Sequence, residues 1–326
     1  MKHSLARLLA GLFGATLAFG ASHAQVADFP NRPIRLLVPY APGGVADTNA
    51  RILAGKMNER LGWNMIVENR PGARGQIAST AVAKATPDGY TLLAAHTGEF
   101  AINPAVFPNI QYELDRDFIA ITMISDTPMV VLAHKDAPFN TLPELVAAAK
   151  AKPGEIGFST PGTATVNHIA GEWLAYAAGI KLLHVPYKGG APAATAVAAG
   201  EVPIGVVAIP GAIPHLKSGR VKVLGVTTAK RTTFGPQWVT PKEAGIGDVD
   251  ASNWVGVFAP KGVPKPIVDR LHAEILKTLD MPDTKQRMLD AGGEPAGMSQ
   301  AAFLAKVRRD AERYRVVVKA AGVKAE

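Results

Sequence analysis

The chain has 326 residues, enough for two lobes that each bury a hydrophobic core. It contains no cysteine, which excludes disulfides, thiolate metal sites and a cysteine nucleophile. Its 35 lysines and arginines outnumber its 27 aspartates and glutamates, which gives a formal net charge of +8. Because the basic residues are scattered and form no run of five, we expect no nucleic-acid partner and instead an attraction for small anions.

The N-terminus has the pattern of a cleavable export signal. A basic start containing Lys2 and Arg7 precedes an apolar run from Leu8 to Phe19, and small residues ending at Ala24 follow. The apolar run is too short to span a bilayer, which takes about 20 residues. We therefore predict a signal peptide over residues 1–24 and a periplasmic location; a buried N-terminal helix is the alternative interpretation.

Strands and helices alternate through the first half of the chain. The apolar run 34–38 predicts a buried strand. Apolar positions at steps of four and three then predict a helix from about 46 to 61, which Gly62 ends. A strand at 65–67, a small-residue helix at about 76–85 and a strand at 91–95 are expected next. This alternation is typical of parallel βαβ units.

The same alternation restarts after residue 155. Strands are predicted at 156–158, 182–185, 202–208 and 221–228, with helices at about 166–178, 191–199 and 212–218 between them. From about residue 264 onward the chain is predicted to be helical, with Ser299 as the N-cap of a final helix.

Two α/β blocks followed by helices predict two doubly wound lobes rather than one sheet. No low-complexity linker separates the blocks, so ordered strands near 125–130 and 250–256 are expected to cross between the lobes. We assign residues 25–127 and 251–326 to lobe 1 and residues 128–250 to lobe 2.

Two strand-to-helix loops carry the strongest indication of a ligand site. In open α/β sheets ligands bind beyond the carboxyl ends of the strands, and a helix N-terminus offers unpaired N–H groups to an anion. Glycine allows close approach to the backbone, and hydroxyl side chains can donate to carboxylate oxygens. The loops are Tyr40-Ala41-Pro42-Gly43-Gly44-Val45-Ala46-Asp47 and Ser159-Thr160-Pro161-Gly162-Thr163-Ala164-Thr165. One loop from each lobe would hold an anion from two sides, although such turns also occur without any ligand.

Other motifs of catalysis or cofactor binding do not occur in the sequence. There is no Walker loop, no G-x-G-x-x-G after a strand, no G-x-S-x-G elbow and no H-E-x-x-H. We therefore expect no cofactor, no metal and no enzymatic activity. The alternative from another class is an exported hydrolase that uses Ser159 and His168, but no orienting acid stands at a recognisable spacing. Asp47 is expected to cap helix amides more than to meet an anionic ligand.

The sequence resembles the substrate receptors of tripartite tricarboxylate transporters, often called the Bug family. The resemblance runs in order along nearly all of the chain after residue 26. It rests on Pro33-Ile34-Arg35, Ala41-Pro42-Gly43-Gly44, Glu68-Asn69-Arg70-Pro71-Gly72, Thr86-Pro87-Asp88-Gly89-Tyr90, Asn103-Pro104, His184-Val185-Pro186-Tyr187-Lys188-Gly189, Pro214-His215 and Trp254-Val255-Gly256.

This resemblance implies a type II periplasmic-binding-protein fold with the ligand between the lobes. It implies a receptor for a small carboxylate, which delivers its ligand to a large and a small membrane permease subunit. We expect this receptor to be a monomer. Both loops would hold the carboxylate groups, and Thr97 and Gly98 would join them. The full set of expected ligand-binding residues is Tyr40, Ala41, Gly43, Gly44, Asp47, Thr97, Gly98, Ser159, Thr160, Gly162, Thr163, Thr165, His168, Tyr187 and Ala208.

Three departures from the family pattern bear on the ligand. Val207 stands where an acid is usual, which removes a partner for a ligand ammonium. Arg74 replaces a small residue, and Glu99-Phe100 follows the Thr97-Gly98 pair. Phe100 could stack on an aromatic ring of the ligand, although a simple packing role is the stronger interpretation of this residue. We therefore predict an aromatic mono- or dicarboxylate. An aliphatic di- or tricarboxylate, an acidic amino acid, or a role as ligand-sensing partner of a membrane kinase are the alternatives.

Overall fold

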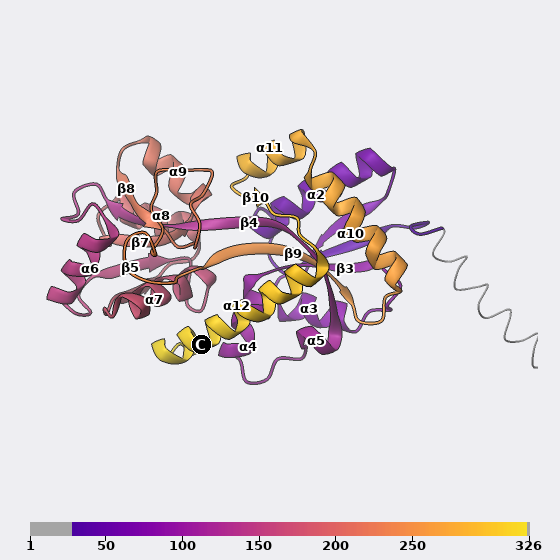
Figure 1. Ribbon diagram of the computed structural model, residues 1–326, viewed down its shortest axis with the longest axis horizontal. Helices are drawn as coiled ribbons and strands as arrows, with labels where there is room; N and C mark the ends of the chain where they lie inside the picture. The colour runs from indigo at the N-terminus through magenta and orange to yellow at the C-terminus, as the bar shows by residue number, and fades with distance from the viewer. Residues whose placement is uncertain (1–27, 325–326) are drawn as a thin grey trace, which may run out of the picture.

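The computed structural model describes residues 28–324, so the predicted signal peptide lies outside the described residues. Two α/β lobes lie side by side along the long axis of the molecule (Figure 1). The strands run in the order β2-β1-β3-β9-β4-β7-β5-β6, with β10 and β8 also paired to β4. Among residues 28–324, no helix combines the length and apolarity that crossing a bilayer requires.

Lobe 1 is built on a parallel core of three strands. β1 (Ile34–Val38) pairs in parallel with β2 (Met65–Asn69) and with β3 (Thr91–His96). α2 (Val45–Leu61) connects β1 to β2 and ends at Gly62, whose φ of 66° is the left-handed conformation that glycine adopts without strain. η1 (Ala73–Gly75) and α3 (Gln76–Ala83) lead to β3.

Short helices follow β3 before the chain leaves lobe 1. These are η2 (Gly98–Ile102), α4 (Asn103–Val106) and α5 (Leu114–Asp117). The sequence contained no periodic signal for them, because each is too short to show one.

Lobe 2 repeats the same construction. α6 (Leu142–Ala151) and β5 (Gly157–Thr160) precede α7 (Val166–Ala178), which also ends at a left-handed glycine, Gly179 with φ 63°. β5 pairs in parallel with β6 (Leu183–Pro186) and β7 (Ile204–Ala208). The remaining elements are α8 (Gly190–Ala198), α9 (Ile209–Lys217) and β8 (Val221–Val226).

Two strands cross between the lobes, as the sequence predicted. β4 (Phe118–His134) pairs antiparallel with β9 (Ser252–Pro260) up to Pro128, and from Met129 onward it pairs with β7 and β8 of the other sheet. The fold is therefore the two-lobed type II architecture, with the change of sheet between Pro128 and Met129. The lobe boundaries assigned from the sequence stay a proposal.

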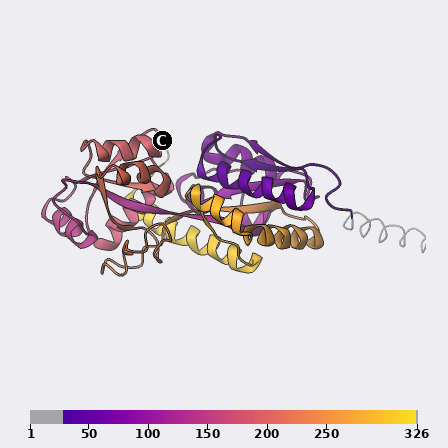
Figure 2. The ribbon, with the colours of Figure 1, turned by 90° about the horizontal axis from the view of Figure 1, so that it is seen from above.

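The C-terminal helices pack along lobe 1 and then reach lobe 2. α10 (Lys265–Leu279), α11 (Pro282–Asp290), β10 (Glu294–Pro295) and α12 (Gln300–Ala321) follow β9. Figures 1 and 2 both show α12, in yellow, running from one lobe toward the other. Its Tyr314 meets Trp173 of α7 edge to face, with ring centroids 5.5 Å apart. α12 thus contacts both lobes in addition to the two crossing strands.

Candidate functional site

A cavity of about 170 Å³ lies between the lobes, where strands of both sheets end at their carboxyl edges. We call it the interlobe cavity. Lobe 1 contributes Tyr40, Arg74, His96, Gly98 and Asn103; lobe 2 contributes Pro161, Ala164, Thr165, Val166 and Asn167; Asn253 comes from crossing strand β9. Tyr40 of the first loop and Pro161, Ala164 and Thr165 of the second loop therefore line one space.

The first loop presents an uncapped helix start. Gly44 is the N-cap of α2, and no side chain accepts a hydrogen bond there from the first-turn amides. Ala41, Gly43 and Gly44 are exposed. Free N–H groups with the positive end of the helix dipole favour an anion at this position.

Asp47 holds the first loop in shape. Its carboxylate accepts a hydrogen bond from the Gly43 amide at 2.9 Å, and it also accepts from Arg51 and from Asn69. Burial by itself raises the pKa of the Asp47 carboxyl, but the hydrogen bonds from Arg51, Gly43 and Asn69 together outweigh burial and lower the pKa. Its carboxylate oxygens are thus occupied by the protein, through the amide of Gly43 before the N-cap rather than through the first-turn amides of α2 that the sequence predicted it to cap.

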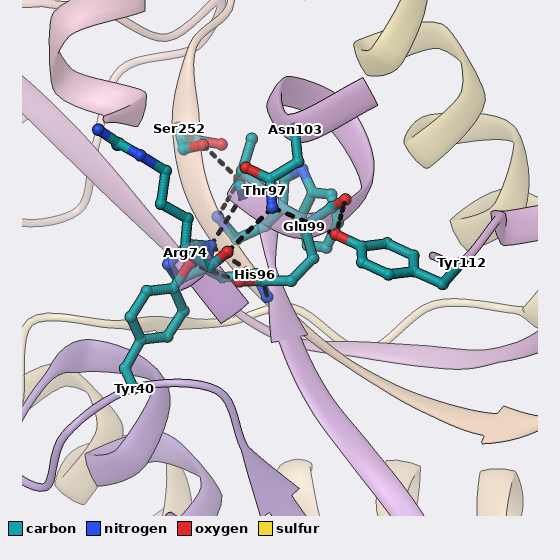
Figure 3. A network of polar contacts seen from close by, with 10 residues as sticks. Tyr40, Arg74, His96, Thr97, Glu99, Asn103, Tyr112 and Ser252 are labelled. Carbon is teal, nitrogen blue, oxygen red and sulfur yellow. Dashed lines mark hydrogen bonds and ion pairs between the residues drawn. The ribbon is translucent and has the colours of Figure 1, made fainter. Parts of the chain in front are cut away.

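A buried glutamate, Glu99, organises the floor of the cavity in lobe 1 (Figure 3). One carboxylate oxygen accepts from the Tyr40 hydroxyl, and the other accepts from the His96 amide at 2.8 Å. The Tyr40 ring stacks on the His96 ring at 4.2 Å. Burial, followed by the charge of Glu99, raises the pKa of Tyr40 well above its usual value, so the hydroxyl keeps its proton and donates.

Thr97 and Gly98 lie at the junction between β3 and the crossing strand. The Thr97 hydroxyl donates to the Ser252 carbonyl at 2.9 Å and accepts from the Trp254 amide at 3.0 Å. It therefore ties lobe 1 to the start of β9. Gly98 lines the cavity itself, and its amide donates to His96 Nδ1 at 2.9 Å.

The second loop begins α7 with its own cap. Thr165 is the N-cap: its hydroxyl accepts from the His168 amide and donates to the Gly162 carbonyl at 2.8 Å. Ala164 has a φ of 54°, a left-handed conformation that is costly for alanine. His168 supports this turn, because its Nδ1 accepts from the Ala164 amide at 3.0 Å.

Two stacked histidines stand behind the second loop. The rings of His168 and His184 lie 3.6 Å apart, and His184 Nε2 is 2.7 Å from the Thr160 hydroxyl. Burial, with the neighbouring His168 as a second cause, lowers the pKa of His184 to about 4. At neutral pH His184 is therefore uncharged, and its ring stacks on the ring of His168 without charge repulsion.

Several other residues expected to bind ligand have contacts inside lobe 2. The Ser159 hydroxyl is buried and donates to the Ala193 carbonyl at 2.9 Å. The Tyr187 hydroxyl lies 3.4 Å from Glu201, and Ala208 is the N-cap of α9. Gly162 accepts from Thr165, and the Thr163 carbonyl accepts from Arg74. For these residues contact with a ligand remains a prediction, and their protein contacts give them a supporting place in the loop.

Eight of the residues that line the cavity were absent from the expected set: His96, Pro161, Ala164 and Val166, as well as Arg74, Asn103, Asn167 and Asn253. Arg74, Asn103, Asn167 and Asn253 line the space, and the side-chain oxygen of Asn253 is buried without a hydrogen-bond partner within residues 28–324. Arg74 was noted in the sequence only as a departure from the family pattern. The three asparagines carry no local signal, because they reach the cavity from a short helix, the first turn of α7 and a crossing strand.

Phe100 does not line the cavity. It is 2% exposed and packs in the lobe 1 core against Tyr112, Phe118 and Phe258. A ring bound in the cavity would not stack on it.

Larger cavities lie away from the strand ends. One of about 300 Å³ is formed by Phe100, the 104–115 segment and α12, and another of about 300 Å³ lies beside Asp126 and Lys306 near the crossing strands. Neither contains a residue of the two loops. In the part of the chain that the structure describes, no group of three or more histidines, aspartates or glutamates is arranged to hold a metal ion.

Comparison with known protein families identifies a receptor family. The family model for the tripartite tricarboxylate transporter family receptor matches residues 49–323. BugT of Bordetella pertussis is 31% identical over 98% of this chain and 99% of its own length.

Two solved structures share both the fold and a third of the sequence. The Rpa4515 protein of R. palustris, solved with adipate, is 31% identical with a TM-score of 0.79 over 91% of this chain and 99% of that chain. MatC of Rhodopseudomonas palustris, solved with malate, is 31% identical with a TM-score of 0.74 over 89% of this chain and all of that chain. The protein therefore belongs to the tripartite tricarboxylate transporter receptor family, the periplasmic solute-binding proteins of Bug type.

Proposed function

We propose that this receptor captures a small carboxylate in the interlobe cavity. The observation that carries the proposal is the convergence, in one space between the lobes, of Tyr40 from the first loop, the start of α7 and Arg74, with no acid among the lining residues. Backbone N–H groups and a guanidinium attract a carboxylate, and a charge-assisted hydrogen bond is worth about 1.5–3 kcal/mol. Three or four such bonds, less the cost of immobilising the ligand, support an affinity near the micromolar range, about 8 kcal/mol.

An aliphatic dicarboxylate is the ligand class that we now favour. The aromatic preference drawn from the sequence depended on Phe100, which packs in the core of lobe 1. The relatives solved with adipate and malate each hold a dicarboxylate, which supports the same class here. Calorimetry with adipate, succinate, terephthalate, phthalate and benzoate tests this: binding of the aromatic acids alone would restore the earlier preference.

Binding would proceed by closure of the two lobes about β4 and β9. A ligand that contacts both lobes stabilises the closed arrangement over the open one, which shifts the population toward closure. We propose that the closed monomer presents its ligand to the large and small permease subunits, after export directed by residues 1–24. The alternative is that the ligand-bound receptor acts as a sensor for a membrane kinase instead of delivering its ligand to a permease. The genes beside this one would distinguish these two roles.

Hydrolysis is disfavoured by the contacts of its proposed residues. The Ser159 hydroxyl donates to a backbone carbonyl, and His168 Nδ1 accepts from a backbone amide. A nucleophile and its base would need to face each other within hydrogen-bond reach. A receptor gives saturable binding without product, so incubation with ester substrates separates the two functions.

The variant Gly44→Asp tests the first helix start. The position has extended backbone at φ −76°, and a Cβ there would meet only the Ala41 carbonyl at 3.8 Å, so aspartate fits and is a favourable N-cap. Its carboxylate would occupy the amides that the ligand needs. We expect an unchanged or higher melting temperature and an affinity for the carboxylate lowered by about tenfold or more.

The matched control is Gly55→Asp on the same helix. A Cβ at this exposed position meets nothing within 4 Å, and the residue lies about 16 Å along the helix from Gly44. This variant adds the same charge away from the cavity, so its affinity should stay near that of the parent. Retention of full affinity by Gly44→Asp would remove the first loop from the proposed site.

A further inference from the structure

Arg74 lies in a turn of unusual backbone conformation beside the interlobe cavity. Ala73 and Arg74 have φ values of 45° and 52°, and across the cavity Ala164 has 54°. Among residues 28–324 these three are the non-glycine residues with positive φ. Strained backbone of this kind persists only where surrounding structure imposes it, and it concentrates at functional sites. Here Arg74 of lobe 1 and Ala164 of lobe 2, both with strained backbone, line the same cavity.

The contacts of Arg74 direct its charge across the cavity. Its carbonyl accepts from the Asn103 side chain at 2.9 Å, which holds the turn to lobe 1. Its Nη1 donates to the Thr163 carbonyl of lobe 2 at 2.7 Å. Figure 3 shows the side chain extended, with the guanidinium pointing away from Tyr112. The strained turn thus places a cation of one lobe against the loop of the other.

The guanidinium has no acidic partner within the described residues 28–324. A guanidinium has five N–H donors, and the structure gives this one a single hydrogen bond, to Thr163. Glu99, the buried acid nearby, already accepts from Tyr40 and from the His96 amide. By contrast, Arg70, four residues earlier, is paired with Glu68 at 2.7 Å. The guanidinium carbon also lies 5.9 Å from the centroid of the Phe107 ring. Within the described residues, Arg74 therefore brings to the cavity a positive charge that pairs with a carbonyl and an aromatic ring but with no acid.

We propose that Arg74 is the specificity-determining residue of the site and binds a second anionic group of the ligand. This rests on the proposed function, in which the helix starts of α2 and α7 take the first carboxylate. Arginine grips a carboxylate in a bidentate, planar manner, so it selects a dianion whose second group reaches it. A monoacid leaves the guanidinium unpaired in the closed cavity.

The same charge selects against amino acids. A ligand ammonium would face a cation, and no acid among the lining residues would pair with it. Val207 is fully buried in the lobe 2 core and offers no charge either. The class that fits is therefore a small dicarboxylate without an amino group.

The test varies the ligand and residue 74 together and compares the resulting affinities. Calorimetry would measure adipate and hexanoate, which differ by one carboxylate, against the parent chain, Arg74→Gln and Arg74→Lys. We expect the parent chain to prefer adipate by about tenfold to hundredfold, and Arg74→Gln to lose that preference while its affinity for hexanoate changes by less than about threefold. Arg74→Lys keeps the positive charge but lacks the planar, bidentate donors of the guanidinium, so its preference for adipate should lie between those of the parent chain and Arg74→Gln.

Arg70→Gln is the matched control, since it removes the same charge from the same segment and should leave both affinities unchanged. An equal loss for adipate and hexanoate in Arg74→Gln, or no loss for either, would overturn the inference and leave carboxylate binding in place. Failure of the parent chain to bind any diacid from succinate to adipate would overturn the proposed function itself and the inference with it. If Arg74→Gln fails to fold, Arg74→Lys alone decides: full adipate preference in it contradicts selection by the guanidinium fork.

Discussion

Several side chains at this site make hydrogen bonds to one another and thereby hold the residues that line the cavity in place. Glu99 illustrates this, because it is fully buried and touches no solvent, yet it fixes Tyr40 and the backbone of His96. Gly75 permits the arrangement: a Cβ there would come within 2.2 Å of the Glu99 carboxylate. The close approach of the 72–75 turn to Glu99 therefore depends on glycine, and that turn carries Arg74.

The variant Tyr40→Phe should destabilise the protein. It removes the hydroxyl that donates to Glu99 and leaves a buried carboxylate oxygen without that partner. We expect the free energy of unfolding to fall by about 1–3 kcal/mol, measured by urea denaturation. Tyr187→Phe is the control, because its hydroxyl makes one exposed contact at 3.4 Å and its loss should cost less than about 0.5 kcal/mol. Equal stability of the two variants would show that Glu99 does not depend on Tyr40.

At the residue scale the sequence predicted the loops better than the individual contacts. Of the residues expected to bind ligand, Tyr40, Gly98 and Thr165 line the cavity, and each lies near the end of a strand or the start of a helix. Arg74 and Asn253 were not in the expected set. Their place depends on how a strained turn and a crossing strand pack in three dimensions, and no local pattern encodes that.

Secondary structure elements bring the chemistry to the cavity because the loops after strands β1 and β5 reach it with Tyr40 and Pro161, and because helix α7 begins there. The sequence predicted both helices closely, including their ends at Gly62 and Gly179, since apolar spacing and a C-terminal glycine are local signals. The full length of β4 was not predicted. It serves two sheets in succession, so nearly all of its residues are buried and no alternation marks its ends.

The stacked histidines behind α7 predict a dependence of stability on pH. His184 has a pKa of about 4 in the folded state, against about 6.5 when unfolded. As pH falls, the unfolded chain binds the proton first, so stability is complete above about pH 6.5 and is lost progressively toward about pH 4. His184→Gln cannot take up this proton.

We therefore expect the stability difference between the parent chain and His184→Gln to shrink as pH falls from about 7 to about 5, by urea denaturation at each pH. Protonation would also place a charge against His168, which supports the Ala164 amide. A difference that stays constant across this range would contradict the assignment of the shift to burial of His184.

On the scale of the whole molecule, two crossing strands and one long helix connect the lobes. β4 pairs first with β9 in the lobe 1 sheet and then with β7 in the lobe 2 sheet, and β9 begins where β4 changes sheets. α12 packs on lobe 1 and also on α7 of lobe 2. The sequence predicted the two crossings from the absence of a flexible linker. It did not predict that α12 would reach lobe 2, because an amphipathic stripe shows that a helix is packed and not what it packs against.

Closure about these connections should be visible in solution. With a saturating dicarboxylate, small-angle X-ray scattering should give a smaller radius of gyration than for the free chain, because the ligand favours the closed arrangement. Gly44→Asp, with its lower affinity, should need a correspondingly higher ligand concentration to reach the same change. A ligand that binds by calorimetry without any change in scattering would mean that the lobes do not move on binding.

The most direct measurement for the account as a whole is a crystal structure of the chain with the dicarboxylate that binds most tightly. We expect electron density in the interlobe cavity, with one carboxylate at the starts of α2 and α7 and the other on the guanidinium of Arg74. Density for the acid in the cavity beside Phe100 and Arg308, or an interlobe cavity left without the acid at saturating concentration, would contradict it.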